Sequence, residues 1–484
     1  MNVRTHTRLG IVGSLMPGGT DGAQPRWPDN ARHADIAELR ADHLSPDEMS
    51  GWLAAAPGPT IVTIRRSSDG GGFDGSEDER RQLLTRSLDE GATFIDVELD
   101  SELASTFLLS SPKRVLLSHH ADDLDPSSCA EHARRLLATS AAYVKLVPTA
   151  SSVSDLATVK ELLAASDGRL IHFAMGRAGR LSRLLAFRWG GAATYGSLTQ
   201  GSETAAGQWC VDALRKTFAV NTIGPQTPLQ FLLGREVYSS PSPAMHRAAA
   251  REHDLETRYL PLELDDLDHL QAIESPEGLA VTVPFKEAIV EHCKTLDPVA
   301  SVSRSVNTMR RVAGQWHGAN TDGPATVQLV SKHLDLDGAR VQILGAGGTA
   351  AAIAVALTAV GAKVVIANRH EDRARDLASR VGADWGPADP SSWSKWDLLV
   401  QTTPCRTLAE LSLAETPLTG GLVMDAVYGP DGTELTRQAR AEGLAVVDGL
   451  DLLIAQGSMQ FQLLNECPAD EALMRAAASQ WLSP

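Results

Sequence analysis

A lysine inside an apolar segment, AAYVKLVP, is the first residue of this chain that could do chemistry. Lys145 either extends its amine out of a core or is buried as a nucleophilic amine. Two other segments supply partners, because VLLSHH ends in His119 and His120 and FIDVEL offers Glu98. An amine that forms an imine, a histidine that moves a proton and a carboxylate that orients the histidine make a consistent set, since a protonated imine acidifies the neighbouring C–H. Three arginines would suit a carboxylate on the substrate: Arg40, Arg65 and Arg183.

A second set of residues has the spacing of a dinucleotide site. The segment VQILGAGGTAAAIAVAL reads as a strand, a G-x-G-x-x-A turn and a helix, so backbone N–H groups of the turn can approach a pyrophosphate. The next strand, AKVVIANR, ends in Asn368 and Arg369 without the acidic residue that would bind an NAD ribose. A guanidinium there favours the 2′-phosphate of NADP; a solvated basic start of a helix is the alternative. The turn positions are Gly345, Gly347, Gly348 and Ala350.

The elements that must position the first set alternate as strand-like and helical stretches over about 220 residues. Eight such units are typical of a (β/α)8 barrel, whose chemistry lies at the carboxyl ends of the strands; an open doubly wound sheet is the alternative. The residues at or just inside these ends are Glu38, Arg40, Arg65, Glu98, His120, Lys145, Met175 and Tyr195. The strand-like runs are Ile11–Met16, Ala34–Leu39, Thr60–Ile64, Thr93–Leu99, Val115–Ser118, Ala142–Val147, Leu170–Ala174 and Ala192–Gly196.

A boundary between two unlike halves is predicted at VNTIGPQTP, where Gly and two Pro interrupt any periodicity. Residues 1–222 would form the barrel. A second α/β pattern begins at Leu229, and we expect two lobes in it: 227–332, rejoined by 456–484, and a dinucleotide-binding Rossmann lobe over 333–455.

The motifs of the first half, taken in order, resemble type I 3-dehydroquinate dehydratase: DIAELRAD, TIRRSSDGGGF, FIDVELD, LLSHH, YVKL, MGRAGRLSR and AAGQ. The resemblance implies that Lys145 is the Schiff-base lysine and His120 the general acid/base, with Glu98 orienting His120. The adjacent His119 is the alternative for the proton-transfer role. Residues implied to hold the substrate hydroxyls and carboxylate are Glu38, Arg40, Arg65, Arg183, Thr204 and Gln208.

Two residues of the first half depart from that family's pattern. Thr204 stands where serine is usual, and Ala206 replaces the proline of the closing-loop APGQ motif. Because Thr204 keeps the hydroxyl, we expect a changed rate and not a lost activity.

The second half is similar to shikimate dehydrogenase in the order of SSPSPAMH, VTVPFK, SVNT and GANTDG. The resemblance implies that Lys286 and Asp322 form the catalytic pair, since a lysine ammonium beside a carboxylate can protonate the alkoxide left by hydride transfer. It assigns Ser240 and Ser242 to the substrate carboxylate. Further substrate contacts are implied for Thr282, Asn307 and Gln456, and Gly449 would let the nicotinamide approach.

Departures are more numerous in the second half, although none removes a proton-transfer group. They bear on the cofactor detail and on substrate preference. The departing residues are Arg247, Ala280, His370, Gln401 and Arg406.

Composition bounds the class of protein. The chain has 484 residues with 60 acidic and 44 basic side chains, a formal net charge of -16, which argues against nucleic acid or an anionic membrane as partner. No apolar run approaches the ~20 residues of a membrane span, and we expect neither a signal nor a transit peptide. Five scattered cysteines without metal-ligand spacing favour a reducing cytoplasm. No metal and no obligate protein partner are expected.

Together the two resemblances predict a TIM barrel followed by a two-lobed shikimate dehydrogenase, with NADP as cofactor. The bifunctional enzyme would convert 3-dehydroquinate to 3-dehydroshikimate and then to shikimate. Two alternatives stay open: a second half that prefers quinate or uses NAD, and a metabolite-sensing regulator on decayed enzyme scaffolds. The regulator would be expected to have lost a catalytic group, yet Lys145, His120, Lys286 and Asp322 are all present.

Overall fold

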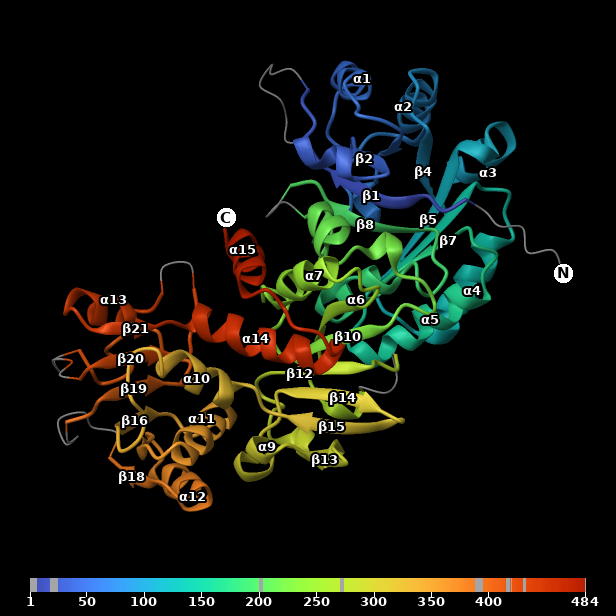
Figure 1. Ribbon diagram of the computed structural model, residues 1–484. Helices are drawn as coiled ribbons and strands as arrows, with labels where there is room; N and C mark the ends of the chain where they lie inside the picture. The colour runs from blue at the N-terminus through green and yellow to red at the C-terminus, as the bar shows by residue number, and fades with distance from the viewer. Residues whose placement is uncertain are drawn as a thin grey trace. The chain divides into compact units, whose positions relative to one another are not determined.

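The computed structural model describes residues 7–17, 25–199, 203–269, 274–387, 395–414, 418, 420–429 and 432–483. The chain divides into two compact units (Figure 1). The first comprises Met1–Thr227 with Asp268–Glu274, and the second comprises Pro228–Leu267 with Ser275–Pro484. No helix in the described ranges is long and apolar enough to cross a membrane.

The first unit is built on a curled parallel sheet in which each strand lies beside the next one in the chain. The last strand returns to the first, because Gly10 pairs with Ala193, and Ala192 N donates to Leu170 O at 2.9 Å across the remaining seam. This order has no switch point, so the doubly wound alternative is wrong and the barrel is confirmed. The strands are β1 Gly10–Leu15, β2 Ile36–Arg40, β3 Thr60–Thr63, β4 Phe94–Glu98, β5 Val115–Ala121, β6 Tyr143–Pro148, β7 Leu170–His172 and β8 Ala193–Ser197, with a short β9 Trp209–Cys210 beside β8.

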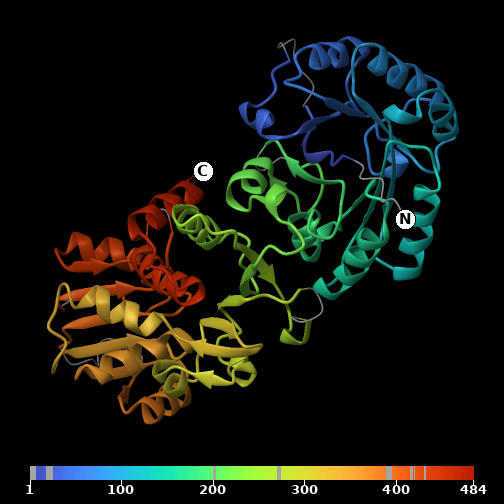
Figure 2. The ribbon, with the colours of Figure 1, turned by 45° about the vertical axis from the view of Figure 1, so that its right-hand side comes forward.

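Helices cover the outer side of this sheet, as the blue-to-green part of Figure 2 shows. Side-chain caps fix where several of them begin: Ser45 and Ser76 each form a capping box, and the Asp125 carboxylate accepts from Ser128 N. The helices are α1 Pro46–Ala54, α2 Glu77–Asp89, α3 Glu102–Ser110, α4 Pro126–Leu137, α5 Leu156–Ala165 and α6 Gly176–Leu185.

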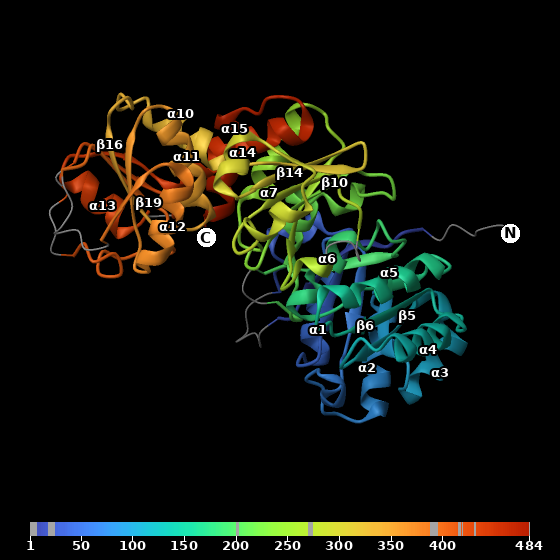
Figure 3. The same ribbon diagram turned by 90° about the horizontal axis from the view of Figure 1, so that it is seen from below.

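The second unit contains two six-stranded sheets, and the first of them is mixed. Its order is β11-β10-β12-β14-β15-β13, with β14 antiparallel to both β12 and β15. The C-terminal helices return to this sheet, where α14 contacts β14 and α15 packs against α7 (Figure 3). Gln460 of α14 donates to Asn307 O at 3.0 Å. The elements are β10 Leu229–Gly234, β11 Arg258–Glu263, β12 Gly278–Val281, β13 Thr295–Leu296, β14 Thr308–Val312, β15 Gln315–Ala319, α7 Ser242–Glu252, α9 Pro298–Ser303, α14 Gly449–Asn465 and α15 Glu471–Leu482.

The other sheet of the second unit is fully parallel, in the order β18-β17-β16-β19-β20-β21. The order reverses at β16, and open parallel sheets bind ligands at such a switch point. Its core is aliphatic, with Ile343, Ile353 and Val400 fully buried. The elements are β16 Arg340–Leu344, β17 Lys363–Ala367, β18 Asp384–Gly386, β19 Leu398–Gln401, β20 Leu422–Asp425, β21 Ala445–Val447, α10 Asp322–Val330, α11 Gly348–Ala359, α12 Glu371–Val381 and α13 Glu434–Ala441.

Candidate functional site

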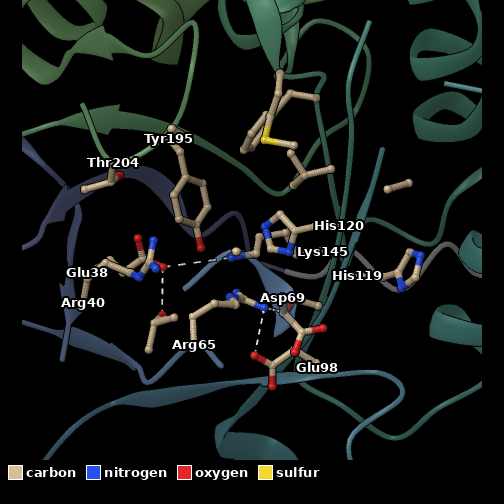
Figure 4. Close-up of a pocket in the computed structure, with 18 of the residues that line it drawn as sticks. Glu38, Arg40, Arg65, Asp69, Glu98, His119, His120, Lys145, Tyr195 and Thr204 are labelled. Carbon is tan, nitrogen blue, oxygen red and sulfur yellow. Dashed lines mark hydrogen bonds and ion pairs between the residues drawn. The ribbon is translucent and has the colours of Figure 1, made fainter. Parts of the chain in front are cut away.

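A cavity of about 490 Å³ lies at the carboxyl ends of the barrel strands and brings the predicted residues of the first half together (Figure 4). Parallel strands end at one edge of a sheet, so side chains far apart in sequence meet there. The predicted residues that line the cavity are Glu38, Arg40, Arg65, Glu98, His119, His120, Lys145, Arg183, Thr204 and Gln208.

Lys145 is buried on β6, with only 3% of its surface exposed. Its Nζ lies 2.5 Å from Asp96 Oδ2 and 4.9 Å from the centroid of the Tyr195 ring. Burial alone would raise the pKa of Asp96, but the cations of Arg65 and Lys145 hold it well below its usual range. The buried lysine therefore has a charged partner that fixes its position.

Glu98 is held by two arginines. Its Oε1 accepts from Arg65 at 3.1 Å, and its Oε2 accepts from the fully buried Arg80. Among the described residues no hydrogen bond joins Glu98 to His120, the contact on which the expected orienting role depends. The geometry instead gives Glu98 the role of holding Arg65, which also bonds Asp96 at 3.0 Å.

The two adjacent histidines lie on opposite sides of β5. Ser118 pairs with Lys145 in the sheet, so His120, two residues further on, projects into the cavity beside the lysine (Figure 4). His119 stacks on His132 at 3.9 Å instead, with its Nδ1 3.5 Å from Asp100. Burial, and then the charges of Arg65 and Lys145, hold the pKa of His120 well below its ordinary value of 6.5. His120 is thus a neutral base near neutral pH.

Hydroxyl and carboxylate groups form a hydrogen-bonded chain along the wall of the cavity that lies across from His120 (Figure 4). Glu38 accepts from Ser14 at 2.5 Å and from Thr63 at 2.9 Å. Thr204 donates to the Ser14 hydroxyl at 2.9 Å, and its backbone N–H donates to Gln208 Oε1 at 3.0 Å. Thr204 therefore uses the hydroxyl that it shares with the serine usual at this position.

Arg183 is a fully buried cation of the cavity. The side chain is 1% exposed, and its Nε and Nη2 have no hydrogen-bond partner among the described residues. Burial, and then the charge of Arg180, lower the pKa of Arg183 to about 9. A substrate carboxylate would satisfy both nitrogens. Arg40, by contrast, is paired with Asp42 at 2.6 Å.

Sequence reasoning missed three carboxylates and one arginine that line this site or hold its residues. Alternation along FIDVEL puts Asp96 on the same face as Glu98, so the signal for Asp96 was present. Asp42 and Asp69 follow β2 and β3, and Asp69 lines the cavity. Arg80 comes from α2, and nothing in its sequence surroundings marks a buried arginine.

In the second unit the predicted catalytic pair is formed. Lys286 Nζ, on the loop after β12, donates to Asp322 Oδ2 at 2.6 Å, and Asp322 is the first residue of α10. Both also contact Thr349, since its Oγ1 lies 2.9 Å from the amine and 3.0 Å from the same carboxylate oxygen. A proton donor beside a carboxylate and a hydroxyl is suited to proton transfer at an alcohol oxygen.

Polar side chains surround this pair. Asn307 Nδ2 donates to Asp322 Oδ1 at 2.9 Å and lies 3.5 Å from Gln456 Oε1. Thr321 joins the same cluster by donating to Gln456 Oε1 at 3.4 Å. The predicted residues Asn307 and Gln456 are therefore brought to the catalytic pair.

The predicted serines lie together before α7. Ser240 Oγ donates to Ser242 Oγ at 3.1 Å, and both residues are buried. Tyr428, which follows β20, also contacts this pair: burial raises the pKa of its phenol, and a hydrogen bond with Ser240 opposes the rise. Tyr428 was missed because a lone tyrosine in a loop carries no sequence signal. Thr282 lies on the loop between β12 and Lys286.

The middle glycine of the turn after β16 leaves room for a dinucleotide to approach the backbone. Gly345 adopts φ +116°, where a side chain would be strained, and a Cβ on Gly347 would meet nothing within 4 Å. A Cβ on Gly449 would lie 2.4 Å from the Val427 backbone, so the start of α14 closely approaches that loop. Ala350 is buried in α11.

Asn368 and Arg369 follow β17 at the same edge of the sheet, and no acidic residue stands between β17 and α12. Arg369 is exposed, and Asn368 donates to His370 O at 3.3 Å. The turn and the guanidinium fit a dinucleotide that carries a 2′-phosphate.

The departures of the second half have local structural consequences. Gln401 is buried and donates to the carbonyls of Thr403 and Cys405, each at 3.0 Å, so it shapes the loop that begins there. Arg406 reaches Tyr428 O at 3.4 Å. Ala280 is fully buried in β12. Burial, and then Arg258, lower the pKa of Arg247 to about 10.

Comparisons with known proteins match each half of the chain to a family. Three family models match: type I 3-dehydroquinase over residues 20–225, the shikimate dehydrogenase substrate-binding domain over 232–309, and shikimate/quinate 5-dehydrogenase over 328–389. The chloroplastic bifunctional 3-dehydroquinate dehydratase/shikimate dehydrogenase of Arabidopsis thaliana is 31% identical over 483 residues, covering 91% of this chain and 79% of that protein.

Other similar proteins match the second half. The NADP(+) shikimate dehydrogenase of an Anaeromyxobacter strain is 38% identical, over 52% of this chain and 96% of that protein. A solved shikimate 5-dehydrogenase of Thermus thermophilus, in complex with NADP(H) and shikimate, is 32% identical, over 53% of this chain and all of that one, with a TM-score of 0.47. On the match that spans both halves, the chain belongs to the family of bifunctional 3-dehydroquinate dehydratase/shikimate dehydrogenases.

Proposed function

We propose that the chain catalyses two consecutive reactions: dehydration of 3-dehydroquinate to 3-dehydroshikimate, and NADPH-dependent reduction of 3-dehydroshikimate to shikimate. The observation that carries the proposal is that one chain holds two lysine-centred sites with different partners. Lys145 lies beside Asp96 and His120 in a buried cavity, and Lys286 lies beside Asp322 at a dinucleotide turn.

In the first reaction the neutral His120 takes one proton from the Lys145 ammonium, and the freed amine attacks the substrate ketone. His120 returns that proton to the former ketone oxygen, which leaves as water as the protonated imine forms. The neutral imidazole of His120 takes the acidified proton from the carbon beside the imine. The electron pair expels the hydroxyl one carbon further on, which leaves as water with the proton from His120. Hydrolysis of the imine consumes one water and frees the lysine, so one water is lost overall.

Two arginines of the barrel cavity have different roles in the proposed reaction. Arg183 has two buried N–H groups available for the substrate carboxylate, which also fixes the orientation of the ring. Arg65 donates to both Asp96 and Glu98 and so holds these two carboxylates in place. Glu38 and Gln208 are left to contact the hydroxyls.

In the second reaction bound NADPH supplies the hydride that reduces the ketone. Lys286, held by Asp322, donates a proton to the oxygen that becomes the alcohol, and in the reverse direction the pair accepts it. Ser240 and Ser242 bind the substrate carboxylate, and Thr282, Asn307 and Gln456 bind the ring hydroxyls. Residues that would hold the cofactor are Gly345, Gly347, Gly348, Ala350, Asn368, Arg369 and Gly449.

The experiment is a single-vessel assay on the full chain with 3-dehydroquinate and NADPH. We expect NADPH oxidation that equals the shikimate formed, preceded by the ultraviolet absorbance of the enone intermediate. The reverse assay uses shikimate and quinate, each with NADP and NAD. Faster oxidation of quinate than of shikimate would replace the substrate that we propose for the second half. A preference for NAD would replace the proposed cofactor. If the enone does not form, the proposed dehydratase reaction of the barrel is refuted.

A cytoplasmic location remains a prediction, and the Arabidopsis relative is described as chloroplastic. The expectation that the chain works without nucleic acid, a membrane or an obligate protein partner likewise remains a prediction. Activity of the purified chain alone would test the last of these.

A further inference from the structure

Thr349 lies where the dinucleotide turn meets the proton-transfer pair. It is the second residue of α11, directly after the glycine turn, and its side chain is half-buried. Its Oγ1 is 2.9 Å from Lys286 Nζ and 3.0 Å from Asp322 Oδ2, and these two atoms are themselves 2.6 Å apart. The three groups thus form a closed triangle of hydrogen bonds.

Donor and acceptor chemistry gives this triangle one arrangement. An ammonium only donates and a carboxylate only accepts, so the hydroxyl accepts from Lys286 and gives its own proton to Asp322. The other carboxylate oxygen is held by Asn307 at 2.9 Å. Lysine has a flexible four-carbon stem, and a second acceptor on a rigid helix restricts where its amine can lie.

The backbone around Thr349 is also fixed in place. A Cβ on the preceding residue, Gly348, would lie 2.5 Å from Ser305 Oγ and 3.2 Å from Lys286 Cβ. The glycine therefore lets the start of α11 press against the loop that carries the catalytic lysine. The Thr349 hydroxyl reaches Lys286 and Asp322 because of this close approach.

We propose that Thr349 is a positioning residue of the dehydrogenase: its hydroxyl holds the Lys286–Asp322 pair in the geometry for proton transfer. The proposal rests on the dehydrogenase function proposed above. The same helix start would lie at the cofactor pyrophosphate, so Thr349 links the dinucleotide turn to the proton-transfer pair. A threonine that only bonded the pyrophosphate would change cofactor binding and leave turnover alone.

The test compares three variants of the full chain in shikimate oxidation with NADP. Thr349→Val keeps the shape and removes the hydroxyl, Thr349→Ser keeps the hydroxyl, and Thr358→Val removes a hydroxyl without a described partner from the other end of the same helix. We expect Thr349→Val to lower kcat about tenfold, the effect of a lost charge-assisted hydrogen bond. KM for shikimate and Kd for NADP should change less than about threefold, and the other two variants should keep kcat within about twofold.

Dehydratase activity of the same preparations and their melting temperatures control for folding. An unchanged kcat in Thr349→Val, an equal loss in Thr349→Ser, or a weakened NADP affinity with unchanged kcat would each overturn the proposal. If the wild-type chain does not oxidise shikimate, the proposed dehydrogenase function fails instead, and the two failures are distinct.

Discussion

The two lysines that we propose as catalytic are the same residue type in contrasting surroundings. Lys145 projects from a β-strand into a cavity, with its side chain 4% exposed, against Asp96, the Tyr195 ring and a neutral histidine. Lys286 lies on a loop, with its side chain 12% exposed, and its partners are one carboxylate and one hydroxyl. The amines of Lys145, on a strand, and Lys286, on a loop, therefore lie in surroundings that suit different reactions.

The neighbouring groups of the two lysines indicate whether each amine is suited to act as a nucleophile or as a proton donor. A nucleophile needs a base that can take protons as its covalent intermediate forms and breaks, and His120 meets this need for Lys145. A proton donor needs only to be held at the oxygen that receives the proton, which the Lys286 triangle provides. We therefore expect changes in one site to leave the other reaction intact.

The largest expected effect comes from exchanging each lysine in turn. Lys145→Met should lower dehydratase kcat about 10⁴-fold or more, because the covalent route is lost. Lys286→Met should lower dehydrogenase kcat about 10²- to 10³-fold, because only proton transfer is lost, with KM for shikimate little changed. Each variant serves as the other's control, since both activities are assayed in both proteins. Loss of both activities in one variant would break the comparison.

Replacing His119 and His120 one at a time should show which of them is the base of the dehydratase. His120→Ala should lower dehydratase kcat about 10³-fold, because the base beside Lys145 is gone. His119→Ala should cost less than about fivefold, since the ring stacks on His132 away from the lysine. Steady-state rates with 3-dehydroquinate decide the matter, and a larger loss in His119→Ala would reverse the assignment.

Anion recognition should also differ between the two units. Arg183→Gln removes a buried cation, and we expect KM for 3-dehydroquinate to rise about 30-fold or more. Arg369→Ala removes an exposed one, and KM for NADPH should rise about tenfold while KM for NADH is unchanged. An equal rise in KM for NADPH and for NADH in Arg369→Ala would show that Arg369 does not bind the 2′-phosphate.

The smallest expected effect is in the pH dependence of the dehydratase. Burial and neighbouring cations lower the pKa of His120 below 6.5, so the imidazole stays neutral as the pH falls through 6.5 and is protonated only below it. The acidic limb of kcat/KM, which reports the free enzyme, should therefore lie below pH 6.5. His119→Ala should share this profile. A limb at or above pH 6.5 would contradict the described surroundings of His120.

The sequence predicts the fold of this chain better than it predicts the contacts within the candidate sites. Alternating strand-like and helical runs predicted the barrel strands, and the G-x-G-x-x-A turn predicted the start of α11, because both depend on local patterns. The expected contact of Glu98 with His120 is absent from the described residues, because Arg80, from a helix, and Arg65 take both carboxylate oxygens. Such competition depends on tertiary neighbours, as does the contact of Thr349 with Lys286.

The most direct test of the central claim, that the two lysines do different chemistry, is borohydride trapping on the full chain. Reduction in the presence of 3-dehydroquinate should leave a stable mass adduct on the peptide that contains Lys145 and none on the peptide that contains Lys286. Lys145→Met should abolish the adduct. No adduct in the wild-type chain, or an adduct on Lys286, would contradict the account.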